Sequence, residues 1–276
     1  MIVQEIVRNI PHPLKPSYAL LTLIPERPHN LFFMNSTYKT IGIVIKRKDW
    51  RENDSLFSFY TRDFGKVEAV AVGSKKITSK LAGHLSSFGL VDLMIARGKR
   101  IDRLAQARLV QKFSFTSLDE FKFYAGLLEF LDKVITGHEA DLAIWNLLEK
   151  TLISYSGNSN HNYREILPIL FYLKVIETLG YRPELYRCVA CHKNNIKHPY
   201  FSYVSNGLVC QSCQIAKETV AKESIIFCRL LYDDQEMLSR VIFNRRTVKH
   251  TADFIDKLIM HIFDKQFFTP KILIKK

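Results

Sequence analysis

Hydrophobic and polar residues alternate along the chain between Tyr38 and Phe113, and this alternation is typical of short β-strands. We expect five strands, at about residues 41–45, 56–60, 67–72, 88–96 and 105–113, and one short helix near residues 79–85. Turn sequences rich in Gly and charged residues, at 61–65 and 97–100, separate neighbouring strands. Five short strands at this spacing favour a small closed barrel.

After Phe113 the hydrophobic period becomes helical. Ser117 and Glu120 form a capping-box sequence, so a helix is expected to begin there. Further helical patterns follow at residues 139–155, 165–179, 217–232 and 247–268, and the one at 165–179 is hydrophobic on nearly every side. The sequence therefore predicts an α+β protein, with a five-stranded β-barrel at residues 38–113 and a helical domain at residues 114–276.

Residues 1–37 show neither pattern. They contain five of the nine prolines in the chain and no periodic arrangement of hydrophobic residues. Such a composition lacks the apolar surface that a packed core requires. We expect a disordered or atypical leader in this segment.

The strongest chemical signal is a pair of Cys-x-x-Cys sequences, Cys188 with Cys191 and, after eighteen intervening residues, Cys210 with Cys213. Each pair places two thiolates on one tight turn. Two such turns joined by a short hairpin give the tetrahedral thiolate set that Zn²⁺ prefers. Because four protein ligands leave no open position, we expect one structural zinc ion per chain. Four reduced, buried cysteines without a metal are the alternative.

The first cysteine pair also fits a second motif, and a fifth cysteine lies apart from the two pairs. Cys188-x-x-Cys191-His192 also fits the attachment sequence of c-type haem, but haem would leave the second cysteine pair unexplained. The fifth cysteine, Cys228, lies in a hydrophobic helical stretch and is expected in the core. Zinc therefore remains the favoured interpretation.

The chain is basic, with 40 Lys and Arg against 27 Asp and Glu and a net charge of +13. Residues 38–113 hold 16 of these basic residues and only 7 acidic ones, so most of the excess lies on the predicted barrel. The clusters near predicted turns are Lys46, Arg47, Lys48 and Arg51, then Lys75, Lys76 and Lys80, and then Arg97, Lys99 and Arg100. Each lysine alone is an ordinary surface charge, but the clusters together favour a polyanionic partner such as DNA. Five aromatic residues of this segment could stack on bases: Trp50, Phe57, Phe59, Tyr60 and Phe64.

No catalytic or phosphate-binding motif was found, which favours a binding protein over an enzyme. A nucleic-acid-processing enzyme that positions its substrate with a zinc ribbon is one alternative, with Asp233-Asp234 as a weak candidate for Mg²⁺. A zinc-ribbon scaffold that binds only proteins is another, although the basic barrel argues against it. Because no signal peptide or membrane span is found in the sequence, we expect a cytoplasmic protein.

At several motifs the chain resembles the RecO family of bacterial recombination mediators. The resemblance is carried by Tyr38-Lys-Thr-Ile-Gly-Ile-Val, Asp49-Trp-Arg-Glu-Asn-Asp54, Thr61-Arg-Asp-Phe-Gly-Lys66, Lys80-Leu-Ala-Gly83, Leu179-Gly-Tyr-Arg-Pro183 and the cysteine quartet. It spans about residues 38–270. Two departures are the residue after the second cysteine, where His192 stands in place of the family's frequent Gly, and the leader, which precedes the family's usual start.

The resemblance implies an N-terminal OB-fold, a helical domain and a zinc-ribbon-like insertion at residues 186–215. It also implies DNA repair and recombination in the RecF pathway by a nucleoid-associated protein. Such a protein would bind single- and double-stranded DNA, anneal complementary strands and help RecA to load onto DNA coated with single-stranded DNA-binding protein (SSB). The implied protein partners are RecR and the acidic C-terminal tail of SSB, with RecA engaged indirectly.

Overall fold

The computed structural model of the chain describes residues 37–85, 88–115, 117–157, 161–194, 196–213, 219–233 and 244–264. Except for Thr37, the leader expected at residues 1–37 lies outside these ranges. So do the start of the helix expected at 217–232 and the end of the helix expected at 247–268. Among the described helices, none is long and apolar enough to cross a membrane.

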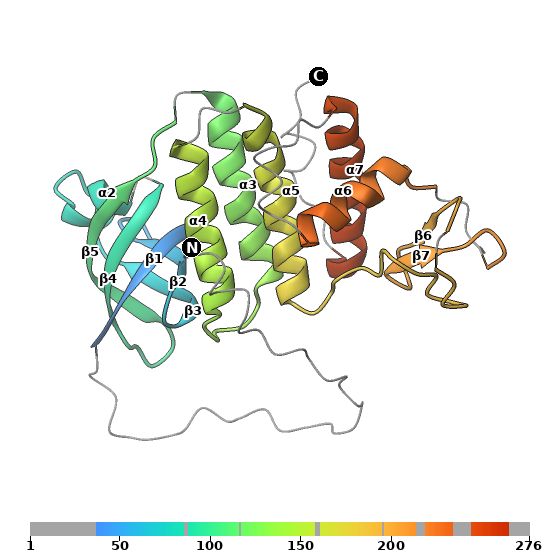
Figure 1. Ribbon diagram of the computed structural model, residues 1–276. Helices are drawn as coiled ribbons and strands as arrows, with labels where there is room; N and C mark the ends of the chain where they lie inside the picture. The colour runs from blue at the N-terminus through green and yellow to red at the C-terminus, as the bar shows by residue number, and fades with distance from the viewer. Residues whose placement is uncertain are drawn as a thin grey trace, which may run out of the picture. The chain divides into compact units, whose positions relative to one another are not determined.

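Five strands form a closed barrel in the first part of the described chain (Figure 1). They are β1 (Thr37–Asp49), β2 (Ser55–Thr61), β3 (Gly65–Ala71), β4 (Gly89–Ala96) and β5 (Asp102–Lys112). Around the barrel their order is β1-β2-β3-β5-β4, with β3 and β5 parallel and all other neighbours antiparallel. The helix α2 (Lys80–Leu85) follows β3 and contributes Leu85 to the barrel core. This is the arrangement of an OB-fold, so the predicted fold class is confirmed.

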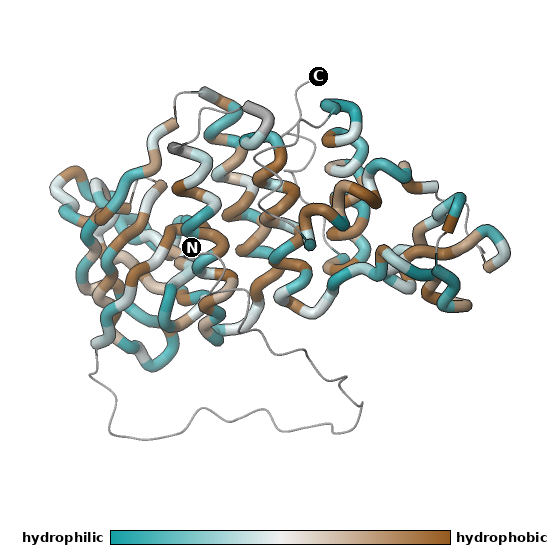
Figure 2. Tube along the Cα trace, viewed as in Figure 1, coloured by the Kyte–Doolittle hydropathy of each residue, from teal (hydrophilic) through white to brown (hydrophobic). Residues whose placement is uncertain are grey.

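Five longer helices follow the barrel. They are α3 (Leu118–Val134), α4 (Leu142–Gly157), α5 (His161–Thr178), α6 (Lys222–Asp233) and α7 (Arg245–Phe263). The helix α3 begins where the capping sequence predicts, because the Ser117 side chain accepts a hydrogen bond from the Glu120 backbone N–H. Figure 2 shows the run of hydrophobic residues along α5, and Phe171, Leu173 and Ile176 in it are fully buried.

Between α5 and α6 lies a small β-ribbon that carries the cysteines. Its two strands, β6 (Tyr200–Ser202) and β7 (Gly207–Val209), pair antiparallel. A two-stranded ribbon of this length buries too little surface to be stable alone. It therefore depends on further interactions with the rest of the chain.

The barrel and the helices share contacts that sequence periodicity does not predict. The Nζ atoms of Lys46 and Lys66, on two different strands, lie 2.6 and 2.8 Å from the Asp132 carboxylate at the end of α3. Burial alone would raise the pKa of Asp132, but the hydrogen bonds and charges of the two lysines outweigh it and lower the pKa.

Gly65 has a φ of +60°, and a Cβ there would lie 2.3 Å from the Glu139 carbonyl oxygen. This strand end is therefore fitted closely to the loop after α3.

The strand pleat decides which barrel aromatics remain available to a ligand. Phe57 and Phe59 lie two residues apart on β2, so both side chains point into the barrel interior, where they are buried. Tyr60 points the other way and stacks against Trp145 of α4, with ring centroids 6.3 Å apart. Phe64 lies against Tyr38 and is partly buried. Of the five aromatics considered for stacking on bases, Trp50 alone is exposed.

Candidate metal centre and nucleic-acid interface

Each of the two Cys-x-x-Cys sequences forms a tight turn in the ribbon. In the first turn the His192 N–H donates to the Cys188 carbonyl at 2.8 Å, and in the second the Cys213 N–H donates to the Cys210 carbonyl at 3.0 Å. His192 has a φ of +59°, in the left-handed region that favours Gly. This conformation explains why a glycine at this position suits the turn and why histidine is still tolerated there.

The four cysteine sulfurs converge on one point. All of them lie within 4.8 Å of one another, and the Sγ atoms of Cys191 and Cys210 are 3.7 Å apart. A tetrahedral zinc site with Zn–S bonds of about 2.3 Å requires sulfurs about 3.8 Å apart. The spacing therefore fits a metal ion held by Cys188, Cys191, Cys210 and Cys213.

The electrostatics of the cluster also favour a cation. Burial acts to raise the pKa of Cys188, but hydrogen bonds from the backbone N–H groups of Cys191, Cys210 and Ala190 lower it to about 6. Hydrogen bonds to the thiols of Cys191 and Cys210 raise the pKa of Cys213 to about 12. Four thiolates this close repel one another unless a positive ion lies between them. A divalent metal would supply that charge.

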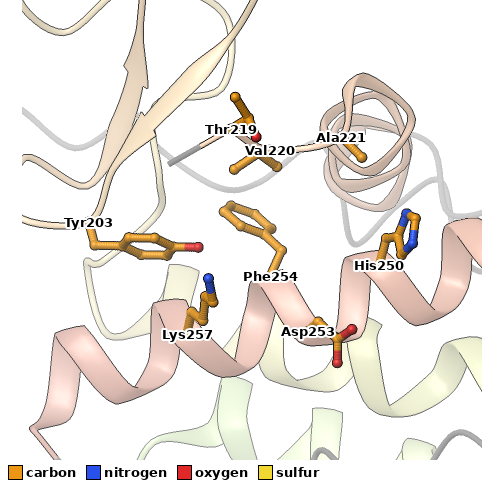
Figure 3. A pocket seen from close by; sticks show the side chains of 8 residues that line it. All are labelled: Tyr203, Thr219, Val220, Ala221, His250, Asp253, Phe254 and Lys257. Atoms are coloured by element: carbon orange, nitrogen blue, oxygen red, sulfur yellow. The ribbon is translucent and has the colours of Figure 1, made fainter. Parts of the chain in front are cut away.

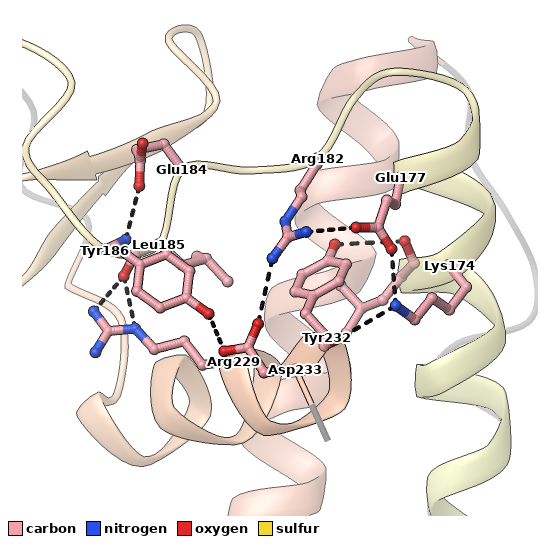
Figure 4. A network of polar contacts seen from close by, with 10 residues as sticks. Lys174, Glu177, Arg182, Glu184, Leu185, Tyr186, Arg229, Tyr232 and Asp233 are labelled. Atoms are coloured by element: carbon pink, nitrogen blue, oxygen red, sulfur yellow. Dashed lines mark hydrogen bonds and ion pairs between the residues drawn. The ribbon is translucent and has the colours of Figure 1, made fainter. Parts of the chain in front are cut away.

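A polar network joins the ribbon to α5 and α6 (Figure 4). Arg229 of α6 donates from Nε to the Leu185 carbonyl at 2.8 Å. Arg182 contacts Glu177 of α5 at 2.6 Å and Asp233 of α6 at 3.6 Å. The Asp233 carboxylate also accepts a hydrogen bond from the Tyr186 hydroxyl. Asp233, considered above as a Mg²⁺ ligand, is thus engaged in holding the ribbon, and Asp234 lies outside the described residues.

A pocket of about 420 Å³ lies where the ribbon meets α7 (Figure 3). Its lining residues are Tyr203, Thr219, Val220, Ala221, His250, Asp253, Phe254 and Lys257. The aromatic ring of Phe254 is held by Phe201 of the ribbon, with ring centroids 4.9 Å apart. One side of the pocket is therefore formed by the packed ring of Phe254, next to basic and acidic side chains of α7.

Barrel closure brings the three basic segments to one end of the barrel. Ser55, the first residue after the β1–β2 turn, pairs with Ala71 of β3. Asp102, the first residue after the β4–β5 turn, pairs with Ala69, which lies two residues before Ala71 on β3. The loop that carries Lys75 and Lys76 leaves from the end of β3. The three clusters, whose members lie between 17 and 54 residues from those of the other clusters in the sequence, therefore surround the end of a single strand.

The ten predicted DNA-binding residues fall into two groups in the structure. Four have partners within the protein: Lys46 binds Asp132, Lys75 binds Asp49, and Arg47 and Arg97 lie over the rings of Phe57 and Tyr38. The other six are exposed and have no ion pair among the described residues: Lys48, Arg51, Lys76, Lys80, Lys99 and Arg100. The second group is the one available to an external anion.

Comparisons with known proteins agree with this architecture. The family model for the recombination protein O N terminal matches residues 34–113, and the model for its C terminal matches residues 121–259. A DNA repair protein RecO of Dehalococcoides mccartyi strain 195 is 32% identical over 245 residues, covering 86% of this chain and 94% of the relative. The DNA repair protein RecO of Syntrophomonas wolfei is 33% identical, covering 67% and 76%, and that of Oceanobacillus iheyensis is 27% identical, covering 82% and 87%.

Proposed function

Because the chain belongs to the recombination protein O family of DNA repair proteins, we propose that it is a DNA-binding recombination mediator. It binds single- and double-stranded DNA, anneals complementary strands and, with RecR, assists RecA loading onto SSB-coated DNA. The observation that carries this proposal is the gathering of three basic segments around the end of β3. Lysines and arginines at turns meet phosphates, so the binding is expected to be independent of base sequence.

The mediator acts without a covalent reaction. A site in which all four positions are filled by cysteines has no position open to a substrate or a water nucleophile. The carboxylate of Asp233 is engaged by Tyr186 and Arg182, which opposes its use as a Mg²⁺ ligand. DNA binding and annealing explain the basic surface, and neither activity requires a catalytic residue. The enzyme alternative is therefore not favoured.

We also propose that the cysteine cluster holds one structural Zn²⁺ per chain. Support comes from the sulfur spacing, the backbone N–H groups that favour a thiolate at Cys188, and the short strands of the ribbon. When bound, the ion joins the two turns and so orders the ribbon. A protein-only scaffold would use the same ribbon, but it would not account for the basic barrel.

The proposed function is tested by strand annealing on complementary DNA strands coated with SSB. The full-length protein is expected to accelerate formation of the duplex without a nucleotide cofactor and to leave both strands at full length. A gel that separates single strands, duplex and shortened products gives all three quantities. Shortened strands would support the nuclease alternative, and an unchanged annealing rate would contradict the mediator.

The pocket beside the ribbon is the proposed docking site for the SSB tail. Two other basic residues of the helical domain, Arg164 and Lys174, form ion pairs with Glu120 and Glu177. The lining of the pocket combines the apolar side chains of Phe254 and Val220 with the charged side chains of Lys257 and Asp253. An acidic peptide with an apolar end is complementary to such a surface.

Lys257→Glu is expected to weaken binding of an SSB tail peptide by about tenfold, because the new carboxylate repels the acidic residues of the peptide. Fluorescence anisotropy of a labelled peptide with the full chain measures the affinity. Lys249→Glu is the matched control, since Lys249 is exposed on the same helix but does not line the pocket. Equal losses in both variants would indicate a general charge effect and would contradict this docking site.

A further inference from the structure

Two neighbouring loops at the basic end of the barrel expose large hydrophobic side chains. They are the β1–β2 turn at residues 50–54 and the β3–α2 loop at residues 72–79. Trp50 is 45% exposed, Val72 is 58% exposed, and Ile77 is fully exposed. Single exposed hydrophobic residues are common on protein surfaces. Here three of them lie in thirteen residues, so the loops differ from an ordinary solvated turn.

Hydrogen bonds join the two loops into one surface. The Gly73 N–H donates to the Asp54 carboxylate at 2.8 Å, and the Lys75 N–H donates to the Asn53 carbonyl at 3.1 Å. The Lys75 ammonium donates to the Arg51 carbonyl at 3.1 Å and lies 2.9 Å from the Asp49 carboxylate. Lys75 thus links the two loops to each other. A surface that is already ordered loses less conformational entropy when a ligand binds.

The hydrophobic residues of these loops alternate with available positive charges. Arg51 follows Trp50 directly, and Lys76 precedes Ile77 directly. Both basic side chains are exposed and have no ion pair within the described part of the chain. Proteins that bind single-stranded DNA combine basic side chains, which contact the phosphates, with aromatic side chains on which the bases stack. An undistorted duplex covers the faces of its internal bases, so side chains that stack on base faces favour unpaired bases.

We propose that Trp50 and Ile77 form a platform for unpaired bases of single-stranded DNA, with Arg51 and Lys76 binding the adjacent phosphates. The platform rests on the proposed function, since it assumes that the barrel binds DNA. Trp50 stacks on the face of one base, and Ile77 contacts a neighbouring one. Stacking leaves the Watson–Crick edges of the bases uncovered. A complementary strand can therefore pair with bases that the platform holds.

The test compares three strands of equal length: oligo-dT, an abasic strand with the same number of phosphates, and a duplex. Trp50→Ala is expected to weaken binding to oligo-dT about 5- to 150-fold, the range seen for removal of a stacking aromatic residue. Its affinities for the abasic strand and the duplex should equal those of the unchanged protein. The salt dependence should also stay the same, because no phosphate contact is lost. Trp50→Phe should retain most of the affinity, because its ring can still stack.

Tryptophan fluorescence gives a direct reading of the same contact. The chain has two tryptophans, and the other one, Trp145, is buried in the core. Oligo-dT is therefore expected to quench the emission of the unchanged protein through Trp50 and to leave the emission of Trp50→Phe unchanged. The abasic strand should quench neither protein.

The outcomes separate the platform from the function on which it rests. If the protein binds DNA but Trp50→Ala binds oligo-dT equally well, the platform is wrong and the proposed function stands. Equal losses on oligo-dT and on the abasic strand also overturn the platform, since the contact would then not be to bases. If the unchanged protein binds no DNA at all, both are wrong. Should Trp50→Ala lower the melting temperature, Ile77→Ser provides a second variant at a fully exposed position, with a smaller expected loss.

Discussion

Cys188→Ser is expected to reduce bound zinc from one ion per chain to nearly none and to unfold the ribbon. The ribbon has only a small core of its own, made by Cys188, Val209 and Cys210 with a few partly buried neighbours. Metal binding provides about 10–16 kcal/mol of apparent free energy in isolated zinc-finger peptides, far more than a core of this size. When the ribbon unfolds, Phe201 no longer packs against Phe254, so part of α7 becomes exposed to solvent. We therefore expect a lower melting temperature for the whole helical domain.

The measurement combines metal analysis with thermal unfolding of protein purified without added zinc. Cys228→Ala is the matched control, since Cys228 is equally buried but lies on α6 outside the cluster. This control should lose some stability through a small cavity, of the order of 1 kcal/mol, and keep its zinc. Well under one equivalent of zinc in the unchanged protein, together with unchanged melting of Cys188→Ser, would contradict a structural zinc site.

Features that depend on nearby residues were predicted from the sequence. Strand and helix periods span only a few residues, so the pattern gave the five strands and the helices close to where they lie. The cysteine cluster was predicted for the same reason, because each Cys-x-x-Cys turn is local and its chemistry is specific. The Ser117 cap is a further case, since its partner is three residues away.

Features that depend on strand register and on distant partners were not predicted. Asp132 holds two barrel lysines that are 86 and 66 residues away, and nothing in the local sequence marks it for that role. The partner of Lys75 is Asp49, which only the pairing of β1, β2 and β3 brings near. Alternation along β2 does indicate that Phe57 and Phe59 share one face, but it does not say which face is inside.

These partners change how DNA binding is best tested. Lys75 and Lys76 are adjacent in one of the predicted clusters, so Lys75→Ala/Lys76→Ala would be a simple double variant. Lys75, however, links the two loops through Asp49 and the Arg51 carbonyl, so its removal is expected to lower stability as well as charge. A variant that changes only exposed cations without ion pairs in the described structure avoids this complication. Lys48, Lys76 and Arg100 each meet that condition and come from three different segments.

Lys48→Ala/Lys76→Ala/Arg100→Ala is expected to weaken binding to single-stranded DNA by about 100-fold at moderate salt and to make it less dependent on salt. Each phosphate contact releases condensed counterions, so log K falls with log salt by about 0.7 per contact on single strands. Five to seven contacts in the unchanged protein give a slope of about −3.5 to −5. Removing three of them should make the slope shallower by about 2, with the melting temperature unchanged because the three side chains are exposed.

The control for that variant removes the same charge from the helical domain. Lys150→Ala/Lys222→Ala/Lys249→Ala also lowers the net charge by three, at exposed positions outside the barrel. If the barrel clusters bind the phosphates, this control should retain the full slope and most of the affinity, because charges beyond about 10 Å are screened at 0.1 M salt. If the charges of the barrel only keep the protein soluble, the two variants should bind DNA alike. An unaltered slope in the barrel variant would place the DNA-binding site on another surface of the chain.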